Sequence, residues 1–335
     1  MDKMPTVKDV AQQAGVSVGT VSRVLAGEAA VKPALREKVR AAIDELGYRP
    51  NVAARALRTN RTDVVGLIIP DITNPFFAQL AASVEAAAMK YGHMVMLATS
   101  HNDGEAERNH LKTFLDRSVD GIIVVAVSEG SLPQVETPVP IVSLDRRYGA
   151  IPLVSTDHAQ AAALAADHLH GLGHRRIAYI AGPQGSEAGR LRKEGFVARV
   201  EELTRPGDEI ELEIIPGQFD YASGESAARE VLARPAELRP TAIAAASDQQ
   251  AIGVLRAVRD LRIDVPGALS VTGFDDINLA DLVVPRLTTI SQPTDLLAKR
   301  AVEQLLGDKG PAGDEVIDGA LIIRRSTGPL PGHAG

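Results

Sequence analysis

From residue 64 onward the chain alternates short apolar runs with longer amphipathic stretches. We expect the apolar runs to form buried strands, at Val64–Ile69, Met94–Ala98, Gly121–Val125, Ile141–Leu144, Ile177–Ala181, Ala242–Ala246, Leu269–Thr272 and Leu287–Ile290. The stretches between them have helical spacing, at Phe76–Tyr91, Ala159–Leu172, Glu187–Glu202, Ser223–Leu232 and Ala251–Leu261. This alternation predicts an α/β fold of parallel sheets covered by helices. Roughly 270 residues suffice for two such sheets, which predicts two lobes with a cleft.

Polar and aromatic side chains follow the ends of these strands. In open α/β sheets, ligands bind at the carboxyl ends of the strands, so a binding site is expected there. Carboxylates and guanidinium groups can bracket sugar hydroxyls, while aromatic rings can cover the C–H faces of a sugar. Aromatic residues are scarce, yet Phe76 and Phe77 stand side by side after the first strand. Taken singly, these rings could be core residues. Asp145 and Asp275 could cap loops, and Arg190 could be a surface cation.

Charge is divided unevenly along the chain. The whole sequence has a net charge of −7, which by itself argues against nucleic acid as a partner. Residues 1–61, however, carry 11 basic and 6 acidic residues, a net +5, which leaves −12 for the remainder. This asymmetry suggests an N-terminal module that meets a polyanion, although charge alone does not separate it from a chance excess.

The first fifty residues have the pattern of three short helices. Thr6 and Ser17 are suitable N-caps for two of them, and Gly15 marks a tight turn in between. Pro33 suits the first position of a third helix, which Gly47 would end. Three helices with a glycine-containing turn between the first two predict a helix-turn-helix, whose second helix enters the major groove of DNA.

The same segment contains the motifs Val7-Lys8-Asp9-Val10-Ala11, Ala14-Gly15-Val16-Ser17, Thr20-Val21-Ser22-Arg23-Val24-Leu25 and Leu46-Gly47-Tyr48. The segment resembles the headpiece of the lactose-repressor (LacI/GalR) family in the position of its turn, its helix caps and its polar residues. This resemblance implies a DNA-binding transcriptional repressor. The headpiece residues expected to contact DNA are Thr6, Ser17, Val18, Gly19, Thr20, Ser22, Arg23, Tyr48 and Asn51.

Chemistry gives these residues different roles. The hydroxyl and amide side chains suit DNA phosphates, and Arg23 suits the O6/N7 edge of guanine. Family members commonly place two specificity residues where this chain has Val18 and Gly19. Neither of these side chains can hydrogen-bond a base, so the sequence does not predict the bases in the outer part of the operator half-site.

The segment after the headpiece, Asn51–Arg58, is helix-compatible but too short to be stable alone. By the same resemblance it is a hinge helix that pairs with a second copy in the minor groove. Ala54 would permit close approach, Leu57 would act as the wedge that kinks the operator, and Arg58 suits the narrow groove. An ordinary basic linker is the alternative.

Residues 62–326 resemble the periplasmic pentose- and hexose-binding proteins. Compared with the ribose-binding branch, the matching positions imply an effector site made of Asn74, Phe76, Phe77, Asp145, Arg146, Arg190, Phe219, Ser247, Asp275 and Gln292. At Ser247 this chain departs from that branch, which has an asparagine there, a longer side chain with more hydrogen-bonding groups. The other positions match, and the resemblance implies that the effector is ribose or a related monosaccharide, acting as an inducer. A corepressor-dependent regulator of a non-sugar metabolite stays open as the alternative.

The resemblance also implies boundaries: a headpiece at 1–49, a hinge at 50–62, a first lobe at 63–160 plus 293–325, a second lobe at 161–292 and a tail at 326–335. The chain would cross between lobes near residues 160, 292 and 323. Phe76–Tyr91 is the expected dimer element, and the tail lacks leucine heptads for a coiled coil. We therefore expect a homodimer on a pseudo-palindromic operator.

Other classes of protein are disfavoured by what the sequence lacks. It has no cysteine, so disulfides, thiolate metal sites and a cysteine nucleophile are excluded, and neither metal nor cofactor is expected. It shows no run of 18 apolar residues and no apolar leader, which favours a cytoplasmic protein without a membrane partner. No dinucleotide, Walker A or G-x-S-x-G motif occurs, and His168, His170 and His174 look like a helix end. A sugar-processing enzyme is the remaining, less favoured alternative.

Overall fold

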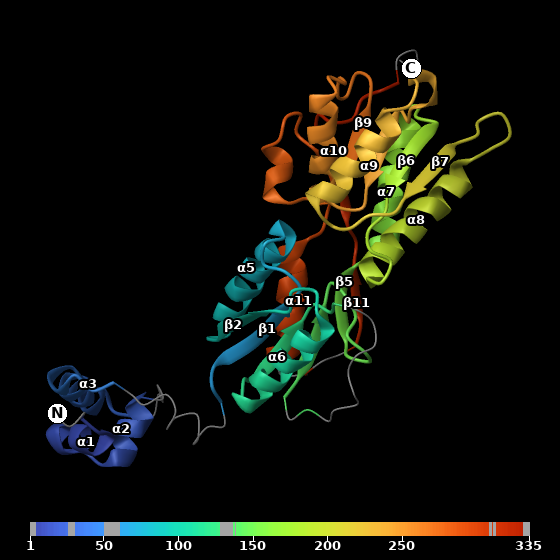
Figure 1. The fold of residues 1–335 in the computed structure, drawn as a ribbon. Helices are drawn as coiled ribbons and strands as arrows, with labels where there is room; N and C mark the ends of the chain where they lie inside the picture. The colour runs from blue at the N-terminus through green and yellow to red at the C-terminus, as the bar shows by residue number, and fades with distance from the viewer. Residues whose placement is uncertain are drawn as a thin grey trace. The chain divides into compact units, whose positions relative to one another are not determined.

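The computed structural model describes residues 5–25, 31–49, 61–127, 137, 139–307, 310 and 313–330. The chain forms two compact units, Met1–Thr62 and Asp63–Gly335, and Figure 1 follows it through both. Four of the residues expected to contact DNA lie outside the described residues; they are Asn51, Ala54, Leu57 and Arg58.

The described part of the N-terminal unit contains the three predicted helices, α1 (Val7–Ala14), α2 (Val18–Leu25) and α3 (Pro33–Leu46). Their small core contains Val10, Ala11, Val21, Val39 and Ala42. Thr6 begins α1 with a capping box, in which its backbone N–H donates to the carboxylate of Asp9 at 2.7 Å. Gly15 ends α1 with φ 64°, a conformation that glycine adopts without strain and that allows the tight turn into α2.

The first lobe of the C-terminal unit is built on a six-stranded parallel sheet, in the order β11-β5-β4-β3-β1-β2. Its strands are β1 (Val64–Ile69), β2 (Met94–Thr99), β3 (Gly121–Val124), β4 (Ile141–Leu144), β5 (Leu153–Thr156) and β11 (Glu315–Ile317). Helices α5 (Pro75–Met89) and α11 (Thr294–Leu306) cover one face, and α6 (Gly104–Asp116) covers the other. Leu67 packs on the first face and Ile68 on the second, which explains the continuous apolar run of β1.

The second lobe has a matching six-stranded sheet in the order β12-β10-β9-β8-β6-β7, in which β12 runs antiparallel to β10 and the other pairs are parallel. Its strands are β6 (Arg176–Ile180), β7 (Glu211–Ile215), β8 (Ala242–Ala245), β9 (Ser270–Asp275), β10 (Thr288–Ser291) and β12 (Ala320–Ile322). Helices α9 (Tyr221–Leu232) and α10 (Asp248–Asp260) cover one face, and α7 (His158–Gly171) and α8 (Glu187–Leu203) cover the other. Two short 3-10 helices, η1 (Ala236–Leu238) and η2 (Asn278–Asp281), complete the lobe.

Three segments join the lobes, and the third differs from its predicted position. The chain crosses between β5 and α7, at residue 157, and between β10 and α11, at residues 292–293. The third crossing lies between β11 and β12, at residues 318–319 rather than near 323, because β12 pairs with β10 of the second lobe. Residues 158–160 and 320–325 therefore belong to the second lobe, not to the first.

The segment expected to be a tail is packed against the second lobe as far as it is described. The Ser326 hydroxyl donates to the carbonyl of Val271 at 2.6 Å and accepts from the N–H of Thr288 at 2.8 Å. The N–H of Leu330 donates to the carbonyl of Leu172 at 3.0 Å. Among the described residues, no helix is both long and apolar enough to cross a membrane.

Candidate functional site

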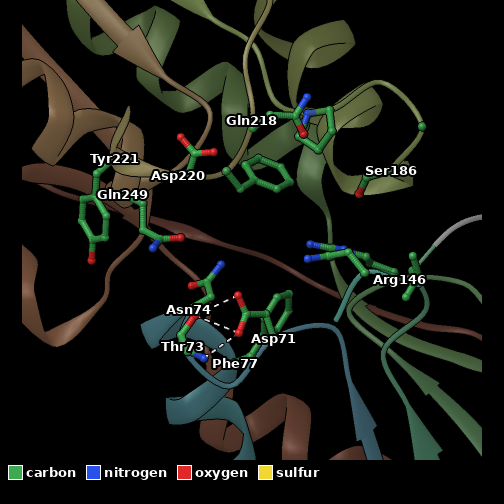
Figure 2. Close-up of a pocket in the computed structure, with 15 residues that line it drawn as sticks. Asp71, Thr73, Asn74, Phe77, Arg146, Ser186, Gln218, Asp220, Tyr221 and Gln249 are labelled. Atoms are coloured by element: carbon green, nitrogen blue, oxygen red, sulfur yellow. Dashed lines mark hydrogen bonds between the residues drawn. The ribbon is translucent and has the colours of Figure 1, made fainter. Parts of the chain in front are cut away.

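A cavity of about 760 Å³ lies between the two lobes, at the carboxyl ends of the strands (Figure 2). Both lobes line it, with Asp71, Thr73, Asn74, Phe77, Asn102, Val127 and Arg146 from the first and Pro183, Gly185, Ser186, Gln218, Phe219, Asp220, Tyr221 and Gln249 from the second. A ligand in this cavity would contact both lobes at once, so its binding depends on their separation.

Arg192 and Asp275 form a buried ion pair beside the cavity. Arg192 Nη1 lies 3.0 Å from Asp275 Oδ1 and donates to the carbonyl of Ala246 at 2.8 Å. Its guanidinium carbon lies over the Phe274 ring, 3.8 Å from the ring centre, in a cation–π contact. Gln292 Nε2 also donates to Asp275 Oδ1, at 2.9 Å. Burial raises the pKa of Asp275 above its ordinary value, although Arg192 opposes this effect.

A second acid–base pair, Asp145 and Arg146, follows β4. Asp145 Oδ2 lies 3.4 Å from Arg146 Nε, and Asp145 Oδ1 lies 3.5 Å from His158 Nε2. Burial by itself raises the pKa of Asp145, but the contact with His158 and the charges of Arg146 and Arg192 outweigh it and lower the pKa below its ordinary value. Asp145 is therefore ionised at neutral pH, and its negative charge compensates the positive charge of the neighbouring guanidinium groups.

Several buried polar atoms around the cavity have no hydrogen-bond partner among the described residues. They are both carboxylate oxygens of Asp145, Arg146 Nε, Ser186 Oγ, Gln249 Oε1 and Gln292 Oε1. Buried polar groups in folded proteins are nearly always paired with protein or with water, so a cluster of unpaired ones marks a place where solvent or a ligand completes the bonding. Donors and acceptors are both present, which suits a ligand rich in hydroxyl groups.

Aromatic rings border the same cavity. Phe77 and Phe219 line it from opposite lobes, and the guanidinium carbon of Arg146 lies 5.1 Å and 5.8 Å from their ring centres. The ring of Phe219 also requires Gly182, because a Cβ at that position would lie 2.4 Å from the ring. Phe76 packs edge-on against Phe77 and is buried in the core of the first lobe, so it supports the site and does not line it.

Two predicted site residues act first as helix caps. The side chain of Asn74 accepts from the N–H of Phe76 at 3.0 Å and begins α5, while Asn74 also lines the cavity. Ser247 accepts from the N–H of Gln250 at 3.3 Å and begins α10. The Ser247 side chain is buried and does not line the cavity, whereas Gln249, two residues later, does.

The structure does not bring Arg190 into this cluster and places Arg192 there instead. The Arg190 side chain is 36% exposed and forms an i,i+4 ion pair with Glu194 at 3.8 Å, on the outer side of α8. Arg192 shares a face of α8 with Ala188 and Phe196, which stand four residues away on either side and are both buried. That spacing was the signal in the sequence that could have selected Arg192.

In the N-terminal unit, the residues in and just before α2 that were expected to contact DNA are accessible. Ser17, Gly19 and Arg23 are exposed, and Thr20 and Ser22 are partly exposed. Val18 is 40% exposed, whereas Val21 is fully buried, so α2 presents Val18 outward as expected. Thr6 is exposed and Tyr48 packs against the helical core.

One group of described residues has the composition of a metal site, and hydrogen bonding accounts for its arrangement. Asp63, His93 and Asp120 place one potential ligand atom each within 4.8 Å of one another. His93 Nε2 lies 3.1 Å from Asp120 Oδ2, and the N–H of Asp63 donates to the same oxygen at 3.0 Å. We assign no ion to this group.

Together, the two units define a class of protein in which a helix-turn-helix module is joined to a two-lobed ligand-binding sensor. The family model for bacterial regulatory proteins of the lacI family matches residues 6–51, and the model for a periplasmic binding protein-like domain matches residues 166–327. The chain is 35% identical to the ribose operon repressor of Escherichia coli K12 over 318 residues, which cover 90% of this chain and 92% of the relative. The chain therefore belongs to the LacI family of transcriptional regulators.

Solved structures agree with this assignment. A lac repressor dimer bound to operator and the anti-inducer ONPF has a TM-score of 0.83 and 30% identity, covering 97% of this chain and 100% of that chain. A LacI family regulator from Enterococcus faecium with bound ribose has a TM-score of 0.69 and 27% identity, covering 80% of this chain and 99% of that one. The α/β fold with two lobes predicted from the sequence is confirmed.

Proposed function

We propose that the protein is a transcriptional repressor that binds its operator as a homodimer and is released when a neutral monosaccharide, ribose or a close relative, enters the cavity between the lobes. The observation that carries the proposal is the cluster of buried polar atoms at that cavity that have no hydrogen-bond partner among the described residues. The ribose operon repressor and the ribose-bound regulator among the relatives support the choice of sugar. The sugar is bound and released without chemical change. Membership of a family of transcriptional regulators supports this part of the proposal.

The charges around the cavity favour a neutral effector. Two guanidinium groups, Arg146 and Arg192, face two carboxyl groups, Asp145 and Asp275, so no excess positive charge is left for an anion. Asp71 and Asp220 add two further acids to the lining. A polyhydroxyl ligand can bond to both kinds of group, whereas an anionic one meets repulsion.

Exposed apolar side chains support the homodimer. On the first lobe, Met89 and Met94 are 62% and 75% exposed at the end of α5 and the start of β2, the edge strand of the sheet. On the second lobe, Leu282 and Val284 are 73% and 93% exposed. Exposed apolar clusters of this kind mark protein interfaces, and a two-fold dimer would match a pseudo-palindromic operator.

The proposal predicts that D-ribose weakens operator binding. The full-length protein first selects its preferred DNA sequence in vitro, and fluorescence anisotropy then follows binding of that DNA. We expect ribose to raise the dissociation constant for DNA about 5- to 150-fold, the usual range of allosteric coupling. Asp275→Ala is expected to bind the DNA normally and to lose the response. Tighter binding with ribose would reverse the sign of the coupling, and an unchanged affinity would contradict ribose as effector.

We expect D-ribose 5-phosphate to bind at least about tenfold more weakly than D-ribose, because its phosphate finds no free cation among the described lining residues and approaches the acids there. Isothermal titration calorimetry of both ligands at one pH and two salt concentrations is the measurement. Tighter binding of the phosphate would indicate an anionic effector, and equal affinities would contradict the preference for a neutral one.

A further inference from the structure

Asp248 is a fully buried acid next to the cavity. It is the first residue of α10, and the residue after it, Gln249, lines the cavity. Asp248 is 0% exposed and both of its carboxyl oxygens are hydrogen-bonded. Oδ2 accepts from the N–H of Ile277 at 2.8 Å, and Oδ1 bonds the hydroxyl of Thr289. These bonds tie α10 to the segment after β9 and to β10.

The segment that Asp248 holds is the turn Asp275–Ile277, which contains a residue of the effector site. Asp275 and Asp276 have φ values of 116° and 52°, which residues other than glycine adopt only at a cost in energy. Gly273 shows how closely the carboxyl group is fitted, because a Cβ there would lie 2.1 Å from Asp248 Oδ1. A strained turn persists only while its surroundings fix it, and the bond from Ile277 to Asp248 is one such constraint.

The same turn contacts the first lobe on its other side. Ile277 is buried in the hydrophobic core that contains α5 and α11. The N–H of Asn278 donates to Gln79 Oε1, on α5, at 2.7 Å. Asp248 is thus bonded to a segment that contributes Asp275 to the effector site at one end and contacts the first lobe at the other.

The charges around Asp248 favour a neutral carboxyl group. Among the described residues no cation forms an ion pair with Asp248, and the acids that face it are Asp275 and Asp276. The nearby cations are engaged with those two acids, Arg192 with Asp275 at 3.0 Å and Arg324 with Asp276 at 2.7 Å. Burial, and then the charge of Asp275, raise the pKa of Asp248 well above its ordinary value.

The geometry points to Asp248 as a positioning residue for the effector site, whose neutral carboxyl group holds the Asp275–Ile277 turn in the conformation that presents Asp275 to the sugar. The statement about the sugar rests on the proposed function, whereas the statement about the turn does not. Asparagine has the same shape and can make both bonds, since its amide oxygen accepts from Ile277 and its amide nitrogen donates to Thr289. Alanine can make neither.

Hydrogen–deuterium exchange of the full-length protein tests the turn without any ligand. In Asp248→Ala, a peptide covering residues 273–280 should exchange at least about tenfold faster than in the wild type, because the Ile277 N–H loses its acceptor. Asp248→Asn should exchange like the wild type. Asp260→Ala and Asp260→Asn, at the exposed end of α10, serve as controls and should leave this peptide unchanged. If Asp248→Ala does not fold, Thr289→Val should still increase the exchange of the peptide.

Calorimetry with D-ribose tests the effector site. Asp248→Ala should weaken binding about tenfold or more, and Asp248→Asn should stay within about threefold of the wild type, with a parallel pH profile between pH 6 and 8. The proposal would be overturned if Asp248→Asn exchanged as fast, or bound ribose as weakly, as Asp248→Ala. That result would mean that the role of Asp248 requires its negative charge. Wild-type exchange in Asp248→Ala would also overturn it. If the wild type does not bind ribose, the proposed effector fails, while the exchange comparison still decides the role of Asp248.

Discussion

Arg192→Met is expected to weaken D-ribose binding at least about a hundredfold, as measured by isothermal titration calorimetry of the full-length protein. The substitution removes the guanidinium group that lies 3.0 Å from Asp275 and leaves that buried carboxyl without its cation. Breaking a buried ion pair by removing one partner typically costs about 3–5 kcal/mol. The share of this cost that comes from misplacing Asp275 appears as weaker ribose binding. Operator binding without sugar should be preserved, since the N-terminal unit has its own core.

The matched control is Arg190→Met, on the same helix. Arg190 is 36% exposed and paired with Glu194, and exposed pairs of this type contribute roughly 0–1 kcal/mol, so ribose binding should change less than about threefold. Circular dichroism and thermal melts of both variants separate a loss of binding from a loss of folding. If Arg190→Met abolished binding and Arg192→Met did not, the sequence-based choice of Arg190 would be right and the assignment made from the structure wrong.

These two arginines show which part of the site could be predicted from the sequence. Asp145, Asp275 and Gln292 directly follow or end strands, and the topology of a parallel sheet takes such positions to one edge whatever the local details. A residue inside a helix depends on which face is buried, and α8 has charged residues on most sides. The spacing of Ala188 and Phe196 about Arg192 carries that information, whereas similarity to a family motif does not.

Four strands were not predicted from the sequence. One of them, β5 (Leu153–Thr156), is buried inside the first sheet, and the other three lie at sheet edges. β7 is an edge strand in which Glu211 and Glu213 alternate with apolar residues, so it lacks the continuous apolar run of a strand buried on both faces. β11 and β12 have three residues each and lie at sheet edges, where pairing rather than composition creates the strand. Missing β12 led directly to the wrong position for the third crossing, because its pairing with β10 assigns it to the second lobe.

Glu107, a fully buried acid on α6, is expected to make the stability of the protein depend on pH. Its Oε2 accepts from the N–H of Val127, a residue of the cavity lining, at 2.8 Å, while its Oε1 has no partner among the described residues. The hydroxyl of Tyr148 is likewise buried and unpaired, and burial together with Glu107 raises the pKa of Tyr148 to about 12. Burial raises the pKa of Glu107 itself from 4.5 to about 7, although Val127 and two arginines oppose it.

Glu107→Gln is therefore expected to stabilise the protein at alkaline pH. Because the folded state favours the protonated acid, the wild type loses stability as the pH rises from the unfolded pKa of 4.5 to the folded value of about 7, and the loss is complete above that. Glutamine keeps the acceptor for Val127 and carries no charge, so its advantage in the free energy of unfolding should be roughly 1 kcal/mol or less at pH 5 and about 3 kcal/mol at pH 8.5.

Urea denaturation followed by circular dichroism at the two pH values measures this difference. Glu105→Gln, an exposed acid on the same helix, should show no comparable dependence on pH. An advantage of Glu107→Gln that is equal at pH 5 and pH 8.5 would mean that glutamine improves packing or hydrogen bonding and that Glu107 does not titrate near neutrality. A loss of stability at pH 8.5 would mean that the ionised carboxylate is the form that the fold requires, with Arg146 or Arg108 as its partner.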